Sequence, residues 1–540
     1  MEGRSLVDRL RADKQEFWTQ RSSYDSVARD LASHVSPFMG RFQVSDANRG
    51  DKKHQLIYDS TATGAHDVLT SGLGSGLTNQ SQRWLKLKTS NDDLNEEHTV
   101  KVWLEEAGDA LLDAFNESNT YASLSHIYGE VCLFGTACCI IESDDENVIH
   151  CYPLTWGQYA IGTNDKGQVN RVFREFQLST SQMISKFGEA NVSEKVRQQA
   201  KRKNWNAKWT VIHAIEPRAM GDRDPKKLDG KNMPWRSVYF EEAKSNSPDV
   251  LQESGYRELP VVAPRWKVVG ANVYGVSPGM DALGPIKRLQ SMTKAEGQTV
   301  ALQARPPLQG PHLHREAIDR TPNGYPAVTD GQEIKPLYES SADLMPLDVL
   351  LLRVQDEIDQ RMYRPLFTAI SDTKKDITKY EAQEIRAESL TQLGPTIGRL
   401  DRELLARLCD ITLGHMFDQG RLPPPPPELE GMDIKPELLG VLAQAQRAAG
   451  ASASDQVQMK IGAHAATKPE VSMIMDEEYD IRTYADTVGA DPRMLVSPEV
   501  YKERLEAHAK AQAAQAQSAV VAEQAGAARD MAQAEATAGA

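Results

Sequence analysis

Residues 281–303 (DALGPIKRLQSMTKAEGQTVALQ) and 346–363 (PLDVLLLRVQDEIDQRMY) decide the fold of this chain, because each has the apolar repeat of a long helix. At about 1.5 Å per residue, the first predicts a rod of roughly 35 Å that ends before Pro306-Pro307. Its apolar stripe is Leu283, Ile286, Leu289 and Met292, its polar face is Lys287, Gln290, Lys294 and Gln298, and the stripe of the second helix is Leu347, Leu351, Val354, Ile358 and Met362. Two helices flanking an irregular excursion are therefore the predicted centre of the architecture.

The excursion, residues 304–344, is rich in proline, glycine and turn sequences such as PPLQGP, TPNGYP and TDG. These predict a compact loop or a small β element. His312, His314 and Glu316 form an H-x-H-x-E string that could bind a metal on a strand. No fourth ligand is evident, so the favoured interpretation is a set of exposed polar residues at a partner-binding tip.

The N-terminal half mixes helices with strands. Asn164-Asp165-Lys166-Gly167 supplies a turn between two runs of strand-type residues. The predicted helices cover 4–35, 55–77 and about 91–118, and the strand-rich blocks cover 136–178 and 208–268. The fold class is therefore α+β, mainly helical.

A second helical region follows residue 363. Thr378 and Glu381 form a T-x-x-E capping box, which predicts a helix start at about residue 379. The helix should run to about 419, with a kink at Gly394-Pro395. Within this acidic chain, Lys374, Lys375 and Lys379 cluster beside the helix start. Such a cluster is either a solvated loop or a loop that contacts DNA phosphates.

The C-terminal region begins with five consecutive prolines at 423–427, which predict a stiff spacer of roughly 15 Å. Beyond them, residues 436–449 and 470–505 have helical patterns. The tail, 501–540, is rich in Ala and Gln with few large apolar groups, and predicts an extended helix or a disordered segment.

The composition narrows the class of protein. With 40% hydrophobic and 26% charged residues among 540, the chain is typical of soluble proteins that bury a core. Its longest uncharged apolar run, 131–141 (VCLFGTACCII), is too short for a bilayer, and the first residues lack the apolar core of a signal peptide. Five cysteines indicate a reducing compartment, so we expect a cytoplasmic protein. A net charge of −14 excludes a wholly basic surface that grips nucleic acid.

Sequence motifs give little support for catalysis. The glycines of SGLGSGL (71–77) are not followed by Gly-Lys-Ser/Thr, so a tight turn explains them better than a phosphate loop. Cys132, Cys138, Cys139 and Cys151 lack a C-x₂-C pair, which favours buried structural thiols over a zinc site. No catalytic signature stands out, so we expect no enzyme activity, no metal and no cofactor.

These segments, in this order, resemble the podovirus-type head-to-tail connecting (portal) family from about residue 4 to about residue 450. The most specific stretch is 253–290 (ESGYRELPVVAPRWKVVGANVYGVSPGMDALGPIKRLQ), which is similar to the family's path from a strand through Arg-Trp and Tyr-Gly into the stem helix. The chain departs from the family at Gln82–Leu85, where Pro-Trp-Phe is frequent, and at Lys379 or Tyr380. Further similar stretches are 58–87, 165–188 (DKGQVNRVFREFQLSTSQMISKFG), MYRPLF, ITKYEAQEIRAE, LGPTIGRLDRELL and the Pro-rich exit after Gly420.

The resemblance implies a division of the chain into the parts of a portal subunit. The stem helices would be 281–303 and 345–364, with the clip, 304–344, between them. The wing would comprise 1–280 and 365–427, including a tunnel loop at 369–379 and the kinked helix 379–419. The crown would be 428–500, and 501–540 a C-terminal tail.

The resemblance also implies the partners. The chain would form a ring of about twelve subunits at one capsid vertex of the virion, assembled in the host bacterial cytoplasm. Double-stranded DNA would pass through without sequence recognition, touching the tunnel-loop lysines Lys374, Lys375 and Lys379 and the stem lysines Lys287 and Lys294. The clip, with His312, His314 and Arg315, would dock the terminase large subunit and then the tail adaptor or nozzle proteins.

The ring would also contact the major capsid and scaffolding proteins, and no membrane. The alternatives are an enzyme that acts on phage DNA, such as a nuclease or NTPase, and an unrelated structural or scaffold protein.

Overall fold

The computed structural model describes residues 6–42, 55–91, 94–95, 97–227, 229–242, 250–305, 308–309, 335–336, 345–368, 393–429, 431–439, 460–461, 479, 481–482, 495–496 and 500–514. The chain divides into two compact units. The first comprises Met1–Lys86, Gly108–Leu422 and Lys435–Ala451, and the second comprises Leu87–Ala107, Pro423–Ile434 and Ser452–Ala540.

The helices predicted in the N-terminal part are confirmed as α1 (Leu6–His34), α2 (Thr61–Leu77) and α4 (His98–Glu117). The apolar run 131–141 was not predicted to be helical at its start, yet it contains the end of α5 (Thr120–Phe134). Gly135 ends α5 in a left-handed conformation (φ 77°), and its N–H donates to the Val131 carbonyl. This turn allows one apolar run to supply both a helix end and the next strand.

The tight turn predicted at 71–77 is wrong, because these residues are the last turns of α2. A Cβ added at Gly72 would lie 2.3 Å from the ring of Phe367, which belongs to α10 (Arg364–Thr368). The glycine therefore serves close packing between two helices, a requirement that the sequence alone does not reveal.

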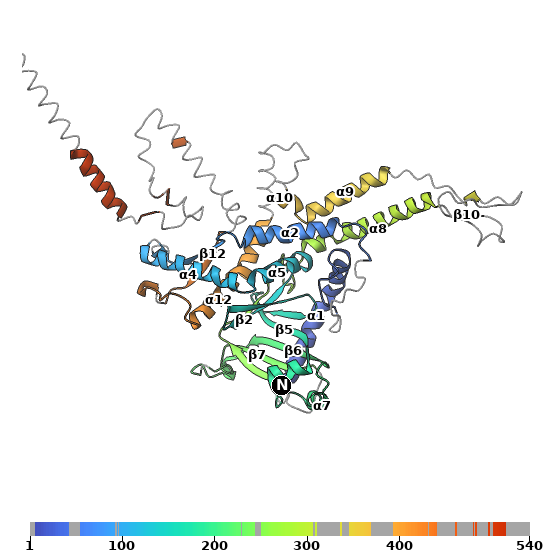
Figure 1. The fold of residues 1–540 in the computed structure, drawn as a ribbon, viewed down its shortest axis with the longest axis horizontal. Coiled ribbons are helices and arrows are strands. Elements are labelled where there is room, and N and C mark those ends of the chain that lie inside the picture. The colour runs from blue at the N-terminus through green and yellow to red at the C-terminus, as the bar shows by residue number, and fades with distance from the viewer. Residues whose placement is uncertain are drawn as a thin grey trace, which may run out of the picture. The chain divides into compact units, whose positions relative to one another are not determined.

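A five-stranded antiparallel sheet has the order β4-β5-β6-β7-β8. Its strands are β4 (Tyr159–Thr163), β5 (Val169–Ser179), β6 (Lys208–Pro217), β7 (Trp235–Glu241) and β8 (Gln252–Tyr256). The predicted turn at 164–167 is confirmed between β4 and β5. Val7 and Leu10 of α1 pack on one set of sheet residues, and α6 (Thr180–Phe187) and α7 (Glu194–Lys201) pack on another. Figure 1 shows α1 running beside this sheet.

A second sheet has the order β3-β2-β9, with β2 (Cys138–Asp144) pairing with β3 (Val148–Leu154) and β9 (Val261–Val262). The short η1 (Met220–Asp222) lies between β6 and β7 in sequence. Together the helices and antiparallel sheets confirm the predicted α+β class.

The two central helices are confirmed as α8 (Pro278–Ala304) and α9 (Met345–Arg361), which lie side by side (Figure 1). Ser277 caps α8, its Oγ accepting from the Met280 N–H, and Pro278 occupies the first turn, where it needs no N–H partner. Of the predicted excursion, Leu308–Gln309 (β10) and Lys335–Pro336 (β11) form an antiparallel pair, in agreement with a small β element.

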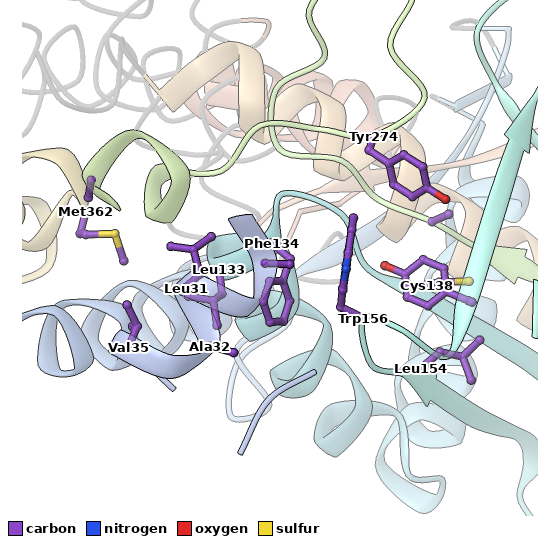
Figure 2. Close-up of a cluster of buried hydrophobic side chains, with 14 of the residues drawn as sticks. Leu31, Ala32, Val35, Leu133, Phe134, Cys138, Leu154, Trp156, Tyr274 and Met362 are labelled. Atoms are coloured by element: carbon purple, nitrogen blue, oxygen red, sulfur yellow. The ribbon is translucent and has the colours of Figure 1, made fainter. Parts of the chain in front are cut away.

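The main hydrophobic core joins α1, α2, α5, both sheets, the first half of α8 and the second half of α9. Trp156 stands between Phe134 and Tyr274, at ring-centroid distances of 5.9 and 5.3 Å (Figure 2). Its indole N–H donates to Asp25 at 2.9 Å, so the buried ring keeps its polar atom satisfied. Truncating such a residue to alanine costs about 3–5 kcal/mol.

Towards the C-terminus, a helix over 393–400 continues through a π-helical turn (Asp401–Leu405) into α12 (Ala406–Asp418). The prolines lead into η4 (Pro427–Leu429). The helix predicted at 436–449 is wrong at its start, because Ile434–Leu438 forms the strand β12. The remaining described strand, β1, is Leu85–Thr89. In the second unit, the Trp103 indole N–H donates to the Pro423 carbonyl, and 500–514 is helical. Within the described residues, no helix is both long and apolar enough to cross a membrane.

Candidate functional site

The α8–α9 pair is buried in one half and exposed in the other. In the buried half, which comprises the first half of α8 and the second half of α9, the two helices pack against each other and against α1, α2 and α5. The buried residues are Ala282, Ile286 and Leu289 of α8 and Leu351, Val354 and Ile358 of α9. The apolar stripes predicted from the sequence therefore serve first to anchor the two helices in the first unit.

The other half of the pair exposes large apolar side chains. Met345 and Leu352 of α9 are 72% and 62% exposed. The set, here called the distal patch, is Val300, Leu302, Met345, Val349, Leu350 and Leu352. Large apolar side chains that are exposed in one region of a chain offer a surface that a partner can cover.

The polar face predicted for α8 divides into residues with different roles. Lys287 Nζ lies 2.5 Å from Asp30 Oδ2 of α1, and Lys294 lies over the Tyr58 ring, 5.5 Å from its centroid. Both lysines are exposed, and their predicted place in a DNA channel stays a prediction.

Gln290, assigned to the same polar face, is instead buried. Its Oε1 accepts from the Tyr58 and Asp59 N–H groups at 2.6 and 2.9 Å, and its Nε2 donates to the Asp59 carbonyl at 2.8 Å. Sequence reasoning missed this role, because a buried glutamine and an exposed one occupy the same place in a helical pattern. The Gln290 side chain fixes α8 to the segment that leads into α2.

Arg265, inside the stretch that carries the resemblance, joins three parts of the first unit. Its guanidinium binds Glu403 of the π-helical turn through Nη2–Oε1 at 2.7 Å and Nε–Oε2 at 3.2 Å. It also donates to the carbonyls of Gly167 and Val273 at 2.9 and 3.3 Å. The Arg265 side chain is only 5% exposed, so this ion pair is largely removed from water.

Glu130 of α5 is a buried carboxyl group that sequence reasoning also missed. It accepts from Thr155 Oγ1 at 2.5 Å and from the Trp156 N–H at 2.9 Å. The same Thr155 Oγ1 accepts from the Gly40 N–H, so one carboxyl organises two loops. Burial raises the pKa of Glu130 to about 7, although both hydrogen bonds favour its ionised form.

All five cysteines are free and buried, which confirms the prediction of structural thiols. Burial raises the pKa of Cys132 and Cys138. Among the described residues, no group of three metal-ligating side chains occurs. The predicted sites at Lys374, Lys375, Lys379, His312, His314 and Arg315 lie outside the described residues.

A known protein family matches most of this sequence. Residues 7–495 match the model of the family described as "Bacteriophage head to tail connecting protein". A probable portal protein of Bordetella phage BPP-1 is 38% identical over 483 residues, 88% of this chain and 86% of that protein. The portal protein of Salmonella phage epsilon15 is 34% identical over 516 residues, covering 94% and 92%. A chain from the neck of an empty gene transfer agent particle aligns over 79% of this chain and 92% of its own, with a TM-score of 0.36 and 12% identity.

Proposed function

Because this chain belongs to the bacteriophage head-to-tail connecting protein family, we propose that it is the subunit of a closed ring of about twelve copies at one vertex of the virion capsid. The observation that carries the proposal is the distal patch, where six large apolar side chains of α8 and α9 are exposed. Neighbouring α8–α9 pairs packed around a ring would cover it. The parts of the chain are the stem, clip, wing and crown expected from the sequence.

The ring forms the channel through which double-stranded DNA enters and leaves the capsid. The net charge of −14 per subunit discourages DNA from adhering to the wall. A few lysines, Lys287 and Lys294 on the stem and Lys374, Lys375 and Lys379 on the tunnel loop, contact phosphates without reading bases.

The clip, 304–344, docks the terminase large subunit during packaging and the tail adaptor or nozzle proteins afterwards, with His312, His314 and Arg315 at its tip. The ring also contacts the major capsid and scaffolding proteins. The subunit assembles in the host cytoplasm and performs no covalent chemistry, so the ATP chemistry of packaging belongs to the terminase.

Native mass spectrometry and negative-stain imaging of the purified full chain test the proposal. We expect closed rings with a central hole, and no nucleotide turnover or metal-dependent DNA cleavage. A chain that stays monomeric over the whole concentration range would contradict the ring, and turnover by the pure protein would favour an enzyme.

A further inference from the structure

A concave basic surface lies in the first unit, and none of the residues that line it belongs to the distal patch. It is a cavity of about 590 Å³ enclosed by the β4–β5 turn, the segment around β9 and the π-helical turn. We call it the basic cavity. The charged side chains that line it are Lys166, Arg265, Arg399, Arg402 and Arg407, with Glu403 as the carboxylate.

The positive charge of the basic cavity is only partly neutralised. Glu403 pairs with Arg265 and lies 3.5 Å from Arg399. Arg407 donates to the Leu259 carbonyl, and Glu258 and Asp410 lie close enough to it for electrostatic interaction.

Lys166 and Arg402, in contrast, are exposed and make no ion pair with any described residue. The surplus charge therefore faces outward, where an anionic partner can reach it. A π-helical turn at such a position is frequent at functional sites, because it displaces side chains from the regular helix face.

An acidic turn of complementary charge lies between β2 and β3, at Asp144, Asp145 and Glu146. We call it the acidic turn. Arg421 Nη2 donates to the carbonyls of Asp145 and Glu146 at 3.2 and 3.1 Å, which fixes the backbone of the turn. The side chains of Asp145 and Glu146 are exposed and have no partner among the described residues.

A second side chain also fixes the backbone of the acidic turn. Gln419 Nε2, just after α12, donates to the carbonyls of Asp144 and Val148 at 3.1 and 3.2 Å. The turn is therefore a fixed negative projection.

The two features lie along one continuous helical run, residues 393–418. Arg402 stands in its π-helical turn, and Gln419 follows its last residue. At about 1.5 Å per residue, roughly 25 Å separate Arg402 from Gln419, so Arg402 lies far from the acidic turn that Gln419 holds in the same chain. In a closed ring, each subunit presents one surface to the next copy and a complementary surface to the previous copy.

We propose that the acidic turn of one copy docks in the basic cavity of the next copy. The inference rests on the proposed ring and names a contact that closes it. Asp145 and Glu146 provide carboxylates for Lys166 and Arg402. Charge pairs at such a contact would fix register more than they add affinity.

Charge reversal in the full chain tests the contact. Lys166→Glu with Arg402→Glu, or Asp145→Lys with Glu146→Lys, should raise the concentration for half-maximal ring assembly at least about tenfold. Combining all four changes in one chain should restore assembly, because every contact again pairs opposite charges. Lys195→Glu with Lys201→Glu on α7 alters the net charge by the same amount as the cavity variant and should leave assembly unchanged. Circular dichroism and urea unfolding of each variant establish that it folds.

A cross-link gives an independent readout, since all five native cysteines are buried. A chain carrying Asp145→Cys and Lys166→Cys should form a ladder of disulfide-linked oligomers on mild oxidation, whereas either single variant should not extend beyond dimers.

The docking would be overturned, and the ring proposal left standing, by either of two results. In the first, the wild-type chain forms rings but the double-cysteine chain forms no disulfide-linked oligomers. In the second, the chain with all four charge changes assembles no better than the two charge-reversal variants. If only the cavity variant impairs assembly, another acidic segment occupies the cavity and this pairing is wrong. A wild-type chain that forms no rings would instead refute the proposed function.

Discussion

Arg265 and Glu403 stand 138 residues apart in the chain, yet the arginine holds the carboxylate through its backbone N–H, Nε and Nη2 at 3.0, 3.2 and 2.7 Å. This ion pair joins the strand-rich part of the first unit to the π-helical turn. The loss of either partner leaves a charge that water reaches poorly.

We therefore expect Glu403→Gln to lower the free energy of unfolding by about 2–3 kcal/mol, somewhat less than the roughly 3–5 kcal/mol of a fully buried pair, because Glu403 is partly exposed. Urea unfolding at pH 7 measures it. The control is Glu357→Gln, which breaks the exposed pair with Arg361 and should cost less than about 0.5 kcal/mol. Equal losses in the two variants would show that the burial of Arg265 has no energetic weight.

Glu130 should make stability depend on pH. Below about pH 4.5 the carboxyl is protonated in both the folded and unfolded states, so it adds no pH dependence. As the pH rises from there to about 7, the unfolded chain ionises first, and stability falls by up to about 3 kcal/mol. Glu130→Gln, which cannot ionise, should flatten this decline. Urea midpoints measured from pH 5 to pH 8 check it, and an unchanged slope in the variant would assign the decline to other groups.

The distal patch should control assembly with little effect on the fold. Val349→Ser with Leu352→Ser should change the unfolding free energy of the subunit by less than about 1 kcal/mol, because both side chains are already exposed. Native mass spectrometry should show loss of rings. Val269→Ser, an exposed apolar residue outside the patch, is the control and should assemble normally. Rings of normal abundance from the patch variant would place the subunit interface elsewhere.

The tunnel-loop lysines should affect DNA retention and leave assembly unchanged. In heads carrying Lys374→Ala, Lys375→Ala and Lys379→Ala together, we expect less retained DNA after packaging in vitro, with intact rings and terminase docking. The difference from wild type should shrink as salt rises, because each phosphate contact is screened. Retained length across a salt series measures it, and wild-type values at every salt concentration would mean that the loop does not touch DNA.

The clip should be needed for docking and dispensable for ring closure. Replacing 309–332 by a short linker should leave rings visible by negative stain and abolish binding of terminase or adaptor in a pull-down. Loss of the rings would instead make the clip part of the subunit interface.

Periodicity predicted α8 and α9 because their anchoring apolar faces repeat over many turns. It could not place Gln290, whose burial depends on the backbone of Tyr58 and Asp59. Nor could it predict the role of Gly72 in α2, because that role is set by Phe367, far along the chain. The basic cavity was missed for the same reason: Lys166, Arg265 and Arg402 are close only after folding, and each alone is an ordinary surface or strand residue.

The burial of every thiol has a consequence for how this protein ages. Oxygen and peroxides attack the thiolate form of cysteine, and they must reach the sulfur to do so. In this chain no cysteine is more than 3% exposed, so the sulfurs are shielded by packed neighbours. In aerated water the cysteines of this subunit therefore form no disulfides with other subunits while the core stays closed, and the lifetime of these thiols is set by how often the core opens.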